Sequence, residues 1–357
     1  MKIAVIYNEP RNTAAEDHWL RRSDPDYRPP SADFVDASEH GVVQQMHSIA
    51  AALSGRGHEV SIFSADDDPG RLCEFLRSER PDAIFNCCES IMGQSRLEMN
   101  VAALYELFGT EYTGSPALAL GIALDKALAK SIFESREIPT PKHQLFSEGD
   151  QFAGGLAFPV IVKPAQEDAS IGIDSNAIVE NETALMARVR FILNEFEQPA
   201  LAEEFIDGRE LNVAVIGGPD GMLETLPISE ITFDKMPPGM PHIVSYEAKW
   251  VEESPVYHTT VPECPARLPA SVEAAARRIA LAAAAAVGLR DYGRVDMRLD
   301  ASDRIFVLEA NPNPDISEDA GFMRAARASG RTYDGTINEI LDLAIARKTD
   351  DSRTFKK

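Results

Sequence analysis

What this sequence lacks argues against several protein classes. It has four cysteines and no CxxC spacing, which gives no support for a disulfide framework or a cysteine-based zinc site. No segment approaches 18 consecutive apolar residues, and the first apolar run, Lys2–Tyr7, is too short for a signal sequence. We therefore expect a cytoplasmic protein without a membrane partner.

Basic residues are also scarce. The chain has 35 lysines and arginines against 57 aspartates and glutamates, a formal net charge of −22. Such a charge repels polyanions at long range, so we expect no nucleic-acid partner. Neither glycine-rich phosphate motif, GxxxxGKS/T or GxGxxG, occurs, so isolated lysines would have to hold any phosphate group.

The residues that are present indicate a globular protein of two or three domains. The length is 357 residues, of which 44% are hydrophobic. Over about the first 120 residues, apolar strands alternate with helices, which predicts an α/β fold with an open parallel sheet. The predicted strands are Lys2–Tyr7, Glu59–Phe63 and Ala83–Asn86, and the predicted helices are Val42–Leu53, Leu72–Ser78 and Met99–Phe108.

A second, smaller unit is predicted after Pro139 and Pro141, which enforce extended backbone. Between the first strand and the first helix, the polar segment 9–38 contains four prolines and is either a lid or substrate loop or a disordered insertion. The other predicted helices are Leu124–Arg136, Thr183–Asn194 and Ala270–Val287, and the other strands are Phe158–Lys163, Ala200–Glu204, Leu211–Ile216 and Ile228–Phe233.

Polar and apolar side chains alternate along Tyr292–Leu299 and Arg304–Ala310, which predicts an antiparallel hairpin. Residues two apart on a strand share one face of the sheet. The polar residues that share a face are Arg294, Asp296 and Arg298 on the first strand, and Glu309 and Asn311 on and just after the second.

A four-residue turn in this hairpin would set Asp296 opposite Val307, with both polar sets on one side of the sheet. Asp296, Glu309 and Asn311 would then lie within reach of one ion. Their oxygen atoms suit Mg²⁺, which keeps several waters and is completed by substrate phosphates. The alternative is a salt bridge between Arg294 and Glu309 on a solvated face.

Three lysines are candidates for binding an anion. Lys163 ends a nearly all-apolar strand, where an unpaired ammonium is costly, so a bound anion is a natural partner. The next segment, PAQEDASIG, is consistent with a flexible flap over phosphates. By their local pattern alone, Lys126 and Lys249 are ordinary surface-helix lysines.

Six ordered segments together resemble the D-alanine–D-alanine ligase branch of the ATP-grasp superfamily. The resemblance covers roughly residues 83–345 and implies an ATP-grasp fold, α/β with an α+β C-terminal part. It implies a preATP-grasp domain at 1–122, a small central domain at 123–206 and a C-terminal domain at 207–350. The segments are YTGSPALALGIALDKALAKSIFESREIPTP, VIVKP, LAEEFIDGREL, SYEAKW, GRVDMRL and LEANPNP.

The resemblance also implies cofactors, partners and residue roles. ATP would lie between the last two domains with Mg²⁺, for which Mn²⁺ can substitute, and the chain would dimerise through its N-terminal domain. Lys249 and Arg294 would neutralise the transferring phosphoryl group and the developing oxyanion. The other implied contacts are Lys126 and Lys163 with phosphates, Glu203, Glu204 and Ile206 in the linker facing adenine, Glu210 with the ribose, and Asp296, Glu309 and Asn311 with the metal.

Departures from the family pattern concern the substrates. After the metal asparagine the family reads close to NTxPGMTxxS, whereas this chain reads NPNPDISEDA. Asp315 thus replaces a glycine at the oxyanion hole, and Ala320 replaces a serine that helps to bind the acceptor's carboxylate. A HGxxGEDG-like loop is replaced by CCESIMGQSRLE, with Glu89 in the histidine's place.

Two further departures fall at the first substrate site. Ala169, next to Ser170, stands where the family has an organising serine. The family's N-terminal GGxSxE turn is missing, and Glu39 is the stand-in for its amine-binding glutamate. We include Ser170 and Glu39, with Glu89 and Asp315, among the candidate substrate residues.

The acids at the acceptor end suggest which amine is used. Asp315, Glu318 and Asp319 would repel an acceptor carboxylate by roughly a kcal/mol or more per close pair. An acceptor that is cationic or lacks a free α-carboxylate follows as a hypothesis. Alternatively, these acids begin a solvated helix that Ser317 caps.

We therefore predict an ATP-dependent ligase that joins an amino-acid-like carboxylate to an amine through an acyl phosphate. The alternatives are a true D-alanine–D-alanine ligase, a nucleotide-binding protein without turnover, and a kinase-like enzyme that stops at phosphoryl transfer. The ligase chemistry would use positioning and charge rather than a protein nucleophile.

Overall fold

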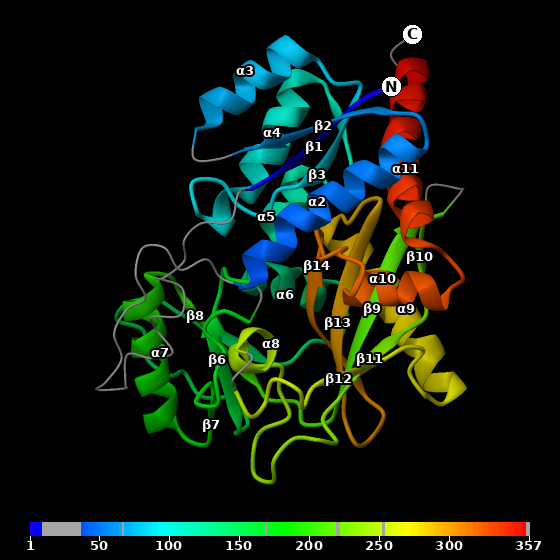
Figure 1. Ribbon diagram of the computed structural model, residues 1–357. Helices are drawn as coiled ribbons and strands as arrows, with labels where there is room; N and C mark the ends of the chain where they lie inside the picture. Colours follow the sequence, from blue (N-terminus) through cyan, green and yellow to red (C-terminus); the bar gives the residue numbers. More distant parts are fainter. Residues whose placement is uncertain (9–36, 66–67, 169, 219–221, 252–253, 355–357) are drawn as a thin grey trace.

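The computed structural model describes residues 1–8, 37–65, 68–168, 170–218, 222–251 and 254–354. The predicted lid or insertion at 9–38 lies outside these residues, except for its last two, which belong to the first helix (Figure 1). Within the described ranges, no helix is both long and apolar enough to cross a bilayer.

The N-terminal unit is a parallel sheet, as predicted, and it has four strands in the order β2-β1-β3-β4. Alternate residues of β1 enter different cores: Ile3 and Val5 pack towards α2, whereas Ala4 and Ile6 pack towards α3 and α4. The elements are β1 (Lys2–Tyr7), α2 (Ala37–Gly55), β2 (Glu59–Ser64), α3 (Pro69–Glu79), β3 (Ala83–Cys87), the 3-10 helix η1 (Ser95–Leu97), α4 (Glu98–Phe108) and β4 (Glu111–Tyr112).

The predicted helix Leu124–Arg136 is observed as α6 (Lys126–Ser135), and it is preceded by a helix that was not predicted, α5 (Ala117–Leu124). Asp125 separates them because its backbone is extended and its side chain accepts the N–H of Leu128 (3.0 Å), an N-cap for α6. The cap fixes the first residue of α6, Lys126, at the edge of the central unit.

The central unit is an antiparallel sheet in the order β5-β8-β6-β7 with α7 packed on one face. Leu185, Val189 and Ile192 of α7 fill the core against β6 and β8. The unit consists of β5 (His143–Phe146), β6 (Val160–Pro164), β7 (Ile178–Val179), α7 (Glu182–Phe196) and β8 (Ala200–Glu204).

The C-terminal unit is built on an antiparallel sheet in the order β12-β11-β9-β13-β14, with β10 paired to β9. The Ala-rich helix α9 covers one face, and the opposite face carries polar side chains. The elements are β9 (Arg209–Gly217), β10 (Leu223–Thr225), β11 (Ser229–Thr232), α8 (Tyr246–Trp250), β12 (Val261–Glu263), α9 (Ala270–Val287), β13 (Tyr292–Leu299) and β14 (Ile305–Asn311).

Two final helices, α10 (Gly321–Ala328) and α11 (Tyr333–Thr354), return to the N-terminal unit (Figure 1). Phe322 and Ile337 share one core with Ile3 and Ile49. The two ends of the chain are therefore packed together, and the limits of the three predicted domains stay a prediction.

Candidate active site

The predicted metal residues lie on the polar face of the C-terminal sheet. Asp296 of β13 is directly opposite Glu309 of β14, and Arg294 is opposite Asn311. Asn212 of β9 pairs with Asp296 from the other side and donates a hydrogen bond to it (2.7 Å). Three adjacent strands thus present polar side chains at one level of the sheet.

The predicted register of this hairpin is wrong, although the predicted shared face is right. Leu299 pairs with Ile305, so the turn is one residue longer than expected, and a β-bulge between Asp296 and Met297 adds one more residue. Asp296 therefore opposes a residue two positions beyond the predicted Val307. A shift of two preserves the face, whereas a shift of one would have reversed it.

The two carboxylates are balanced by cations. Arg294 forms a two-pronged ion pair with Asp296 (2.7 and 2.8 Å) rather than the alternative pair with Glu309. Lys126 lies 3.6 Å from Glu309. Burial raises the pKa of Glu309, but Lys126 and the other neighbouring cations outweigh it and hold that pKa below its ordinary value.

The residues present fit a magnesium ion held jointly with phosphates. Asp296, Glu309 and Asn311 supply two carboxylates and an amide oxygen from adjacent strands. In the described part of the chain, no group of three or more His, Cys, Asp or Glu side chains could hold a metal alone. A cation here would take its remaining ligands from a nucleotide and water, as Mg²⁺ commonly does.

The central unit brings two lysines onto one buried glutamate. Lys163 lies 2.6 Å from Glu203, and Lys130 lies 2.7 Å from the other carboxylate oxygen. Burial opposes ionisation of Glu203, but the two lysines prevail and lower its pKa to about 2. The anion predicted for Lys163 is thus, in this structure, a protein carboxylate.

Lys130 is a functional candidate that the sequence interpretation missed. It is fully buried and also donates to the hydroxyl of Thr140 (2.8 Å), which in turn donates to the carbonyl of Val307 in β14. The signal was present in LDKALAK, because residues four apart on a helix share a face, here Lys126 and Lys130. Lys130 therefore links the central unit to the C-terminal sheet.

Replacing Lys130 with methionine is expected to lower the free energy of unfolding by about 3 kcal/mol at neutral pH, because Glu203 loses one of two buried partners. The folded pKa of Glu203 is about 2 against an ordinary 4.5. The contribution of ionised Glu203 to the free energy of unfolding is therefore complete above pH 4.5 and is lost as the pH falls towards 2. Urea unfolding should show the variant's deficit shrinking over that range. The matched change at exposed Lys142 should have little effect, and equal deficits would contradict the assignment.

Lys126 holds the segment that follows β6. Its ammonium donates to the carbonyl of Glu167 and to Asp168 (3.2 Å), and only 5% of the residue is exposed. The interpretation of Lys126 as a surface lysine is therefore wrong. Burial favours the neutral amine, but Asp168 and Glu309 raise the pKa of Lys126 above its usual range.

The segment between β6 and β7, residues 165–177, is referred to below as the flap; Ala169 lies outside its described residues. Ser170 donates its hydroxyl to the carbonyl of Val244 (2.9 Å). Gly172 has a φ of +77°, and a Cβ atom there would lie 2.4 Å from the ring of Pro164, so only glycine fits. The one glycine of the predicted flap is thus required by its backbone.

The predicted adenine and ribose contacts lie where β8 leads into β9. The N–H of Glu204 donates to the carbonyl of Lys142 (2.9 Å), and Ile206 lies in the short connection to β9. Glu210 is paired with Arg298 (2.9 Å), so a ribose hydroxyl would share this carboxylate with the arginine. These nucleotide contacts stay predictions.

Acidic side chains gather near Lys249. Glu89 keeps contact with solvent, yet surrounding protein atoms desolvate its carboxyl group and raise its pKa to about 7. Asp315 and Asp168 raise that pKa further, and Lys249 opposes them. Burial, followed by the charge of Arg294, lowers the pKa of Lys249.

Glu98 is a second residue that the sequence interpretation missed. It begins α4, is 8% exposed, and accepts a hydrogen bond from the amide of Asn313 (3.1 Å). Burial and the nearby charge of Glu89 raise its pKa well above the usual range. An acid at the start of the apolar run EMNVAALYELF was the available signal. Asn313 also donates to the carbonyl of Cys88 (2.9 Å), which links the end of β14 to this acidic group.

The remaining candidate acids are placed differently. Asp315 accepts the N–H of Ser317 (2.8 Å), and α10 begins only at Gly321, so Ser317 does not cap that helix. Glu318 and Asp319 influence other residues. Burial lowers the pKa of Arg324 and Asp319 opposes that shift, whereas burial raises the pKa of Tyr333 and Glu318 adds to it. Of these three acids, Asp315 alone acts on Glu89. Glu39 lies in α2, and its side chain is outside those described.

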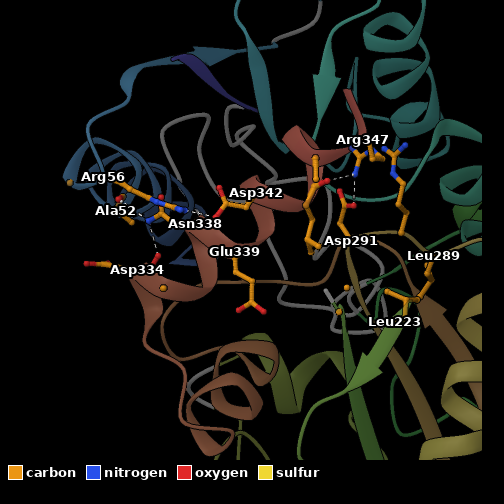
Figure 2. Close-up of a pocket in the computed structure, with 17 residues that line it drawn as sticks. Ala52, Arg56, Leu223, Leu289, Asp291, Asp334, Asn338, Glu339, Asp342 and Arg347 are labelled. Carbon is orange, nitrogen blue, oxygen red and sulfur yellow. Dashed lines mark hydrogen bonds and ion pairs between the residues drawn. The ribbon is translucent and has the colours of Figure 1, made fainter. Parts of the chain in front are cut away.

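A separate cavity of about 1120 Å³ runs along α11 and contains none of the predicted site residues (Figure 2). Arg56 and Asp342 form an ion pair across it (2.5 Å), and Arg347 pairs with Asp291. These two pairs are internal to the protein, and none of the cations that lower the pKa of Glu309 lines this cavity.

Comparisons with known proteins agree with this geometry. The family model described as "D-ala D-ala ligase C-terminus" matches residues 132–342. An uncharacterized protein, y4sG, of Sinorhizobium fredii is 35% identical over 307 residues, which cover 84% of this chain and 87% of that protein. The D-alanine–D-alanine ligase of Stutzerimonas stutzeri is 34% identical over 299 residues, covering 83% of this chain and 87% of the ligase.

Solved structures show the same architecture. The crystal structure of the D-alanine–D-alanine ligase from Bacillus anthracis complexed with ATP aligns with a TM-score of 0.72 at 20% identity, covering 98% of this chain and 99% of that one. A second structure of the same ligase aligns with a TM-score of 0.74 at 21% identity, with the same coverage. The expected ATP-grasp fold with its parallel N-terminal sheet is confirmed.

Proposed function

This chain belongs to the D-alanine–D-alanine ligase family and is an ATP-dependent ligase that forms a carbon–nitrogen bond, and from this premise we propose that its amine acceptor is not D-alanine. We propose that it couples an amino-acid-like carboxylate to an amine that is cationic or lacks a free α-carboxylate, through an acyl phosphate. The product is an amide.

One observation carries the assignment of the reacting centre. Lys126, Lys163, Arg294 and Lys249 all lower the pKa of Glu309, so four cations from three parts of the chain act on one carboxylate. Three of these cations also pair with other carboxylates, Lys126 with Asp168, Lys163 with Glu203 and Arg294 with Asp296. A triphosphate together with a divalent cation would complete this arrangement.

The mechanism uses these side chains as positioned charges. Lys126 and Lys163 would hold the phosphates while the donor carboxylate attacks the γ-phosphorus and ADP leaves. Arg294 and Lys249 would stabilise the charge that develops on the transferring phosphoryl oxygens, and again on the carbonyl oxygen when the amine displaces phosphate. Magnesium, held by Asp296, Glu309 and Asn311, would neutralise phosphate charge when bound.

The acidic residues at the other end of the site support the proposed acceptor. The charge of Asp315 opposes ionisation of Glu89, and the charge of Glu89 in turn helps to raise the pKa of Glu98. Gathered carboxylates of this kind repel an acceptor carboxylate and attract an ammonium group. A cationic acceptor would relieve the repulsion among these acids.

Acceptor binding should depend on pH through Glu89. Its pKa is about 7, so the carboxylate form becomes dominant as the pH rises from 6 to 8, and the KM for a diamine should fall roughly tenfold over that range. Glu89→Gln should flatten this profile and raise the KM at pH 8. Steady-state ADP release at fixed, saturating ATP and donor measures both effects. An unchanged profile in the variant would contradict the role of Glu89.

A matrix of amino acids and amines, scored by ADP release and by product mass, tests the function itself. We expect an amide product and phosphate with diamines or amino-acid amides, and weak turnover with D-alanine as acceptor. Clear preference for two D-alanines would refute the proposed acceptor and establish a true D-alanine–D-alanine ligase. A phosphorylated product without coupling would instead indicate a kinase-like enzyme.

A further inference from the structure

The short helix α8 presents two different charges to two different parts of the protein. Glu247 and Lys249 are two residues apart, which on a helix places them about 200° around the axis from one another. Lys249 responds electrostatically to Arg294 and Glu309 of the C-terminal sheet, and Glu247 responds to Asp174 of the flap and Arg188 of α7. When Glu247 makes a contact on one side of α8, Lys249 therefore points to the opposite side.

Hydrogen bonds join α8 and the residues just before it to the flap. The N–H of Tyr246, the first residue of α8, donates to the carbonyl of Ile173 (2.8 Å), and Ser170 donates to Val244 just before the helix (2.9 Å). These bonds join backbone carbonyls of one segment to donors of the other. The flap and α8 are thus bonded directly to one another.

Arg188 of α7 anchors the flap from beneath. It is 8% exposed, pairs with both carboxylate oxygens of Asp174 (3.0 and 3.2 Å), and donates to the carbonyl of Gly172 (2.9 Å). Its guanidinium also stacks over Phe191, 4.4 Å from the ring centre. The side chain is thus rigidly held by the central unit.

Each of the two oppositely charged groups has one buried atom left without a partner. Among the residues described, Nε of Arg188 and Oε2 of Glu247 are buried and form no hydrogen bond. Burial raises the pKa of the Glu247 carboxyl group, while the N–H of Glu247 and the side chain of Ser245 both oppose that shift. A buried unsatisfied donor or acceptor costs about 1–3 kcal/mol, so a donor and an acceptor that influence one another should pair once α8 can approach.

We propose that Arg188 and Glu247 are positioning residues, which form a buried ion pair when α8 moves closer to α7 and the anchored flap over a bound nucleotide, and so seat Lys249 at the reacting phosphoryl group. The inference rests on the proposed function of Lys249. The flap then has a second role, because besides covering the phosphates it transmits their presence to the helix that carries the catalytic lysine. Neither positioning residue contacts substrate.

Fluorescence of Trp250, at the end of α8, tests the closure without any substrate. The chain has two tryptophans, so in a Trp19→Phe background Trp250 is the sole reporter. Binding of a non-hydrolysable ATP analogue with Mg²⁺ should change its emission. Arg188→Gln and Glu247→Gln should each abolish that change, while calorimetry shows an analogue Kd within about threefold of the parent. Exposed Arg190 on the same helix provides the matched control, Arg190→Gln.

Kinetics provide the second readout. Each single variant should lower kcat 10- to 100-fold with little change in the KM for ATP. The kcat of the double variant should be no lower than that of the less active single variant. A purely structural role would lower the melting temperature and leave kcat at 20 °C unchanged. Additive losses of kcat, or an emission change that persists in both variants, would contradict the ion pair but not the proposed function. Failure of the parent protein to bind the analogue would overturn the proposed function as well.

Discussion

Replacing Glu309 with glutamine is expected to reduce the rate of ADP release at least 1,000-fold, which corresponds to about 4 kcal/mol of lost transition-state stabilisation. The substitution keeps the size of the side chain and removes only its charge. Lys126, 3.6 Å away, and Arg294 would then lack the carboxylate that balances them, and a metal would lose one of its two charged ligands. The fold should survive, because the side chain is 30% exposed.

The control for this variant is Glu224→Gln on β10 of the same sheet. Glu224 forms an exposed ion pair with Arg331 (2.8 Å), and such pairs contribute between zero and about 1 kcal/mol. Both variants should melt within a few degrees of the parent, and only Glu309→Gln should lose ADP release in a coupled assay. Turnover within tenfold of the parent in Glu309→Gln would contradict the metal site.

Local sequence patterns were sufficient to predict the shared polar face but not the pairing behind it. Alternation along β13 and β14 depends only on neighbouring residues, so Asp296, Glu309 and Asn311 could be placed on one side. The alternation contains no information on the length of the turn or on the bulge, so the pairing could not be predicted from it. The longer turn and the bulge each shift the pairing by one residue in the same direction. Their sum is a shift of two, which keeps the polar residues on the predicted face although the register was wrong.

Contacts between distant segments were beyond the reach of sequence patterns. Asn313 and Glu98 are 215 residues apart, and nothing in either local pattern indicates their hydrogen bond. Lys130 reaches Glu203 only because α6 packs beside the central sheet. The packing of α11 on α2 likewise depends on the whole fold. Lys130 and Glu98 were therefore missed, although both lie within segments compared with the family pattern, because their buried partners are far away in the sequence.

The charges of the site fall into two groups that act in opposite directions. Around Glu309, four cations act on one carboxylate, and this clustering of positive groups favours phosphate. Around Glu89, acids predominate and repel one another, which favours an ammonium group. Lys249 lies in the field of both groups. A ligase that activates a carboxylate at one end and receives an amine at the other needs such a division of charge.

Arg294 lies at this division, and replacing it with lysine is expected to lower kcat 100- to 1,000-fold with little change in the KM for ATP. Lysine keeps the positive charge but cannot reproduce the two-pronged contact with Asp296 at 2.7 and 2.8 Å. A less rigid cation stabilises a developing oxyanion less well, because it must reorganise during the reaction. Single-turnover measurements of ADP formation and of product release would locate the affected step.

The hairpin supplies its own control for that substitution. Arg304 pairs with Asp300 at 2.7 Å in the turn, with 71% of the arginine side chain exposed, so Arg304→Lys should leave both kcat and stability nearly unchanged. The comparison separates loss of guanidinium geometry at the reacting centre from a general effect of arginine-to-lysine exchange in this hairpin. If Arg294→Lys retained more than a third of the parent's kcat, charge alone would suffice at this position. The two-pronged contact with Asp296 would then not be required for stabilising the oxyanion.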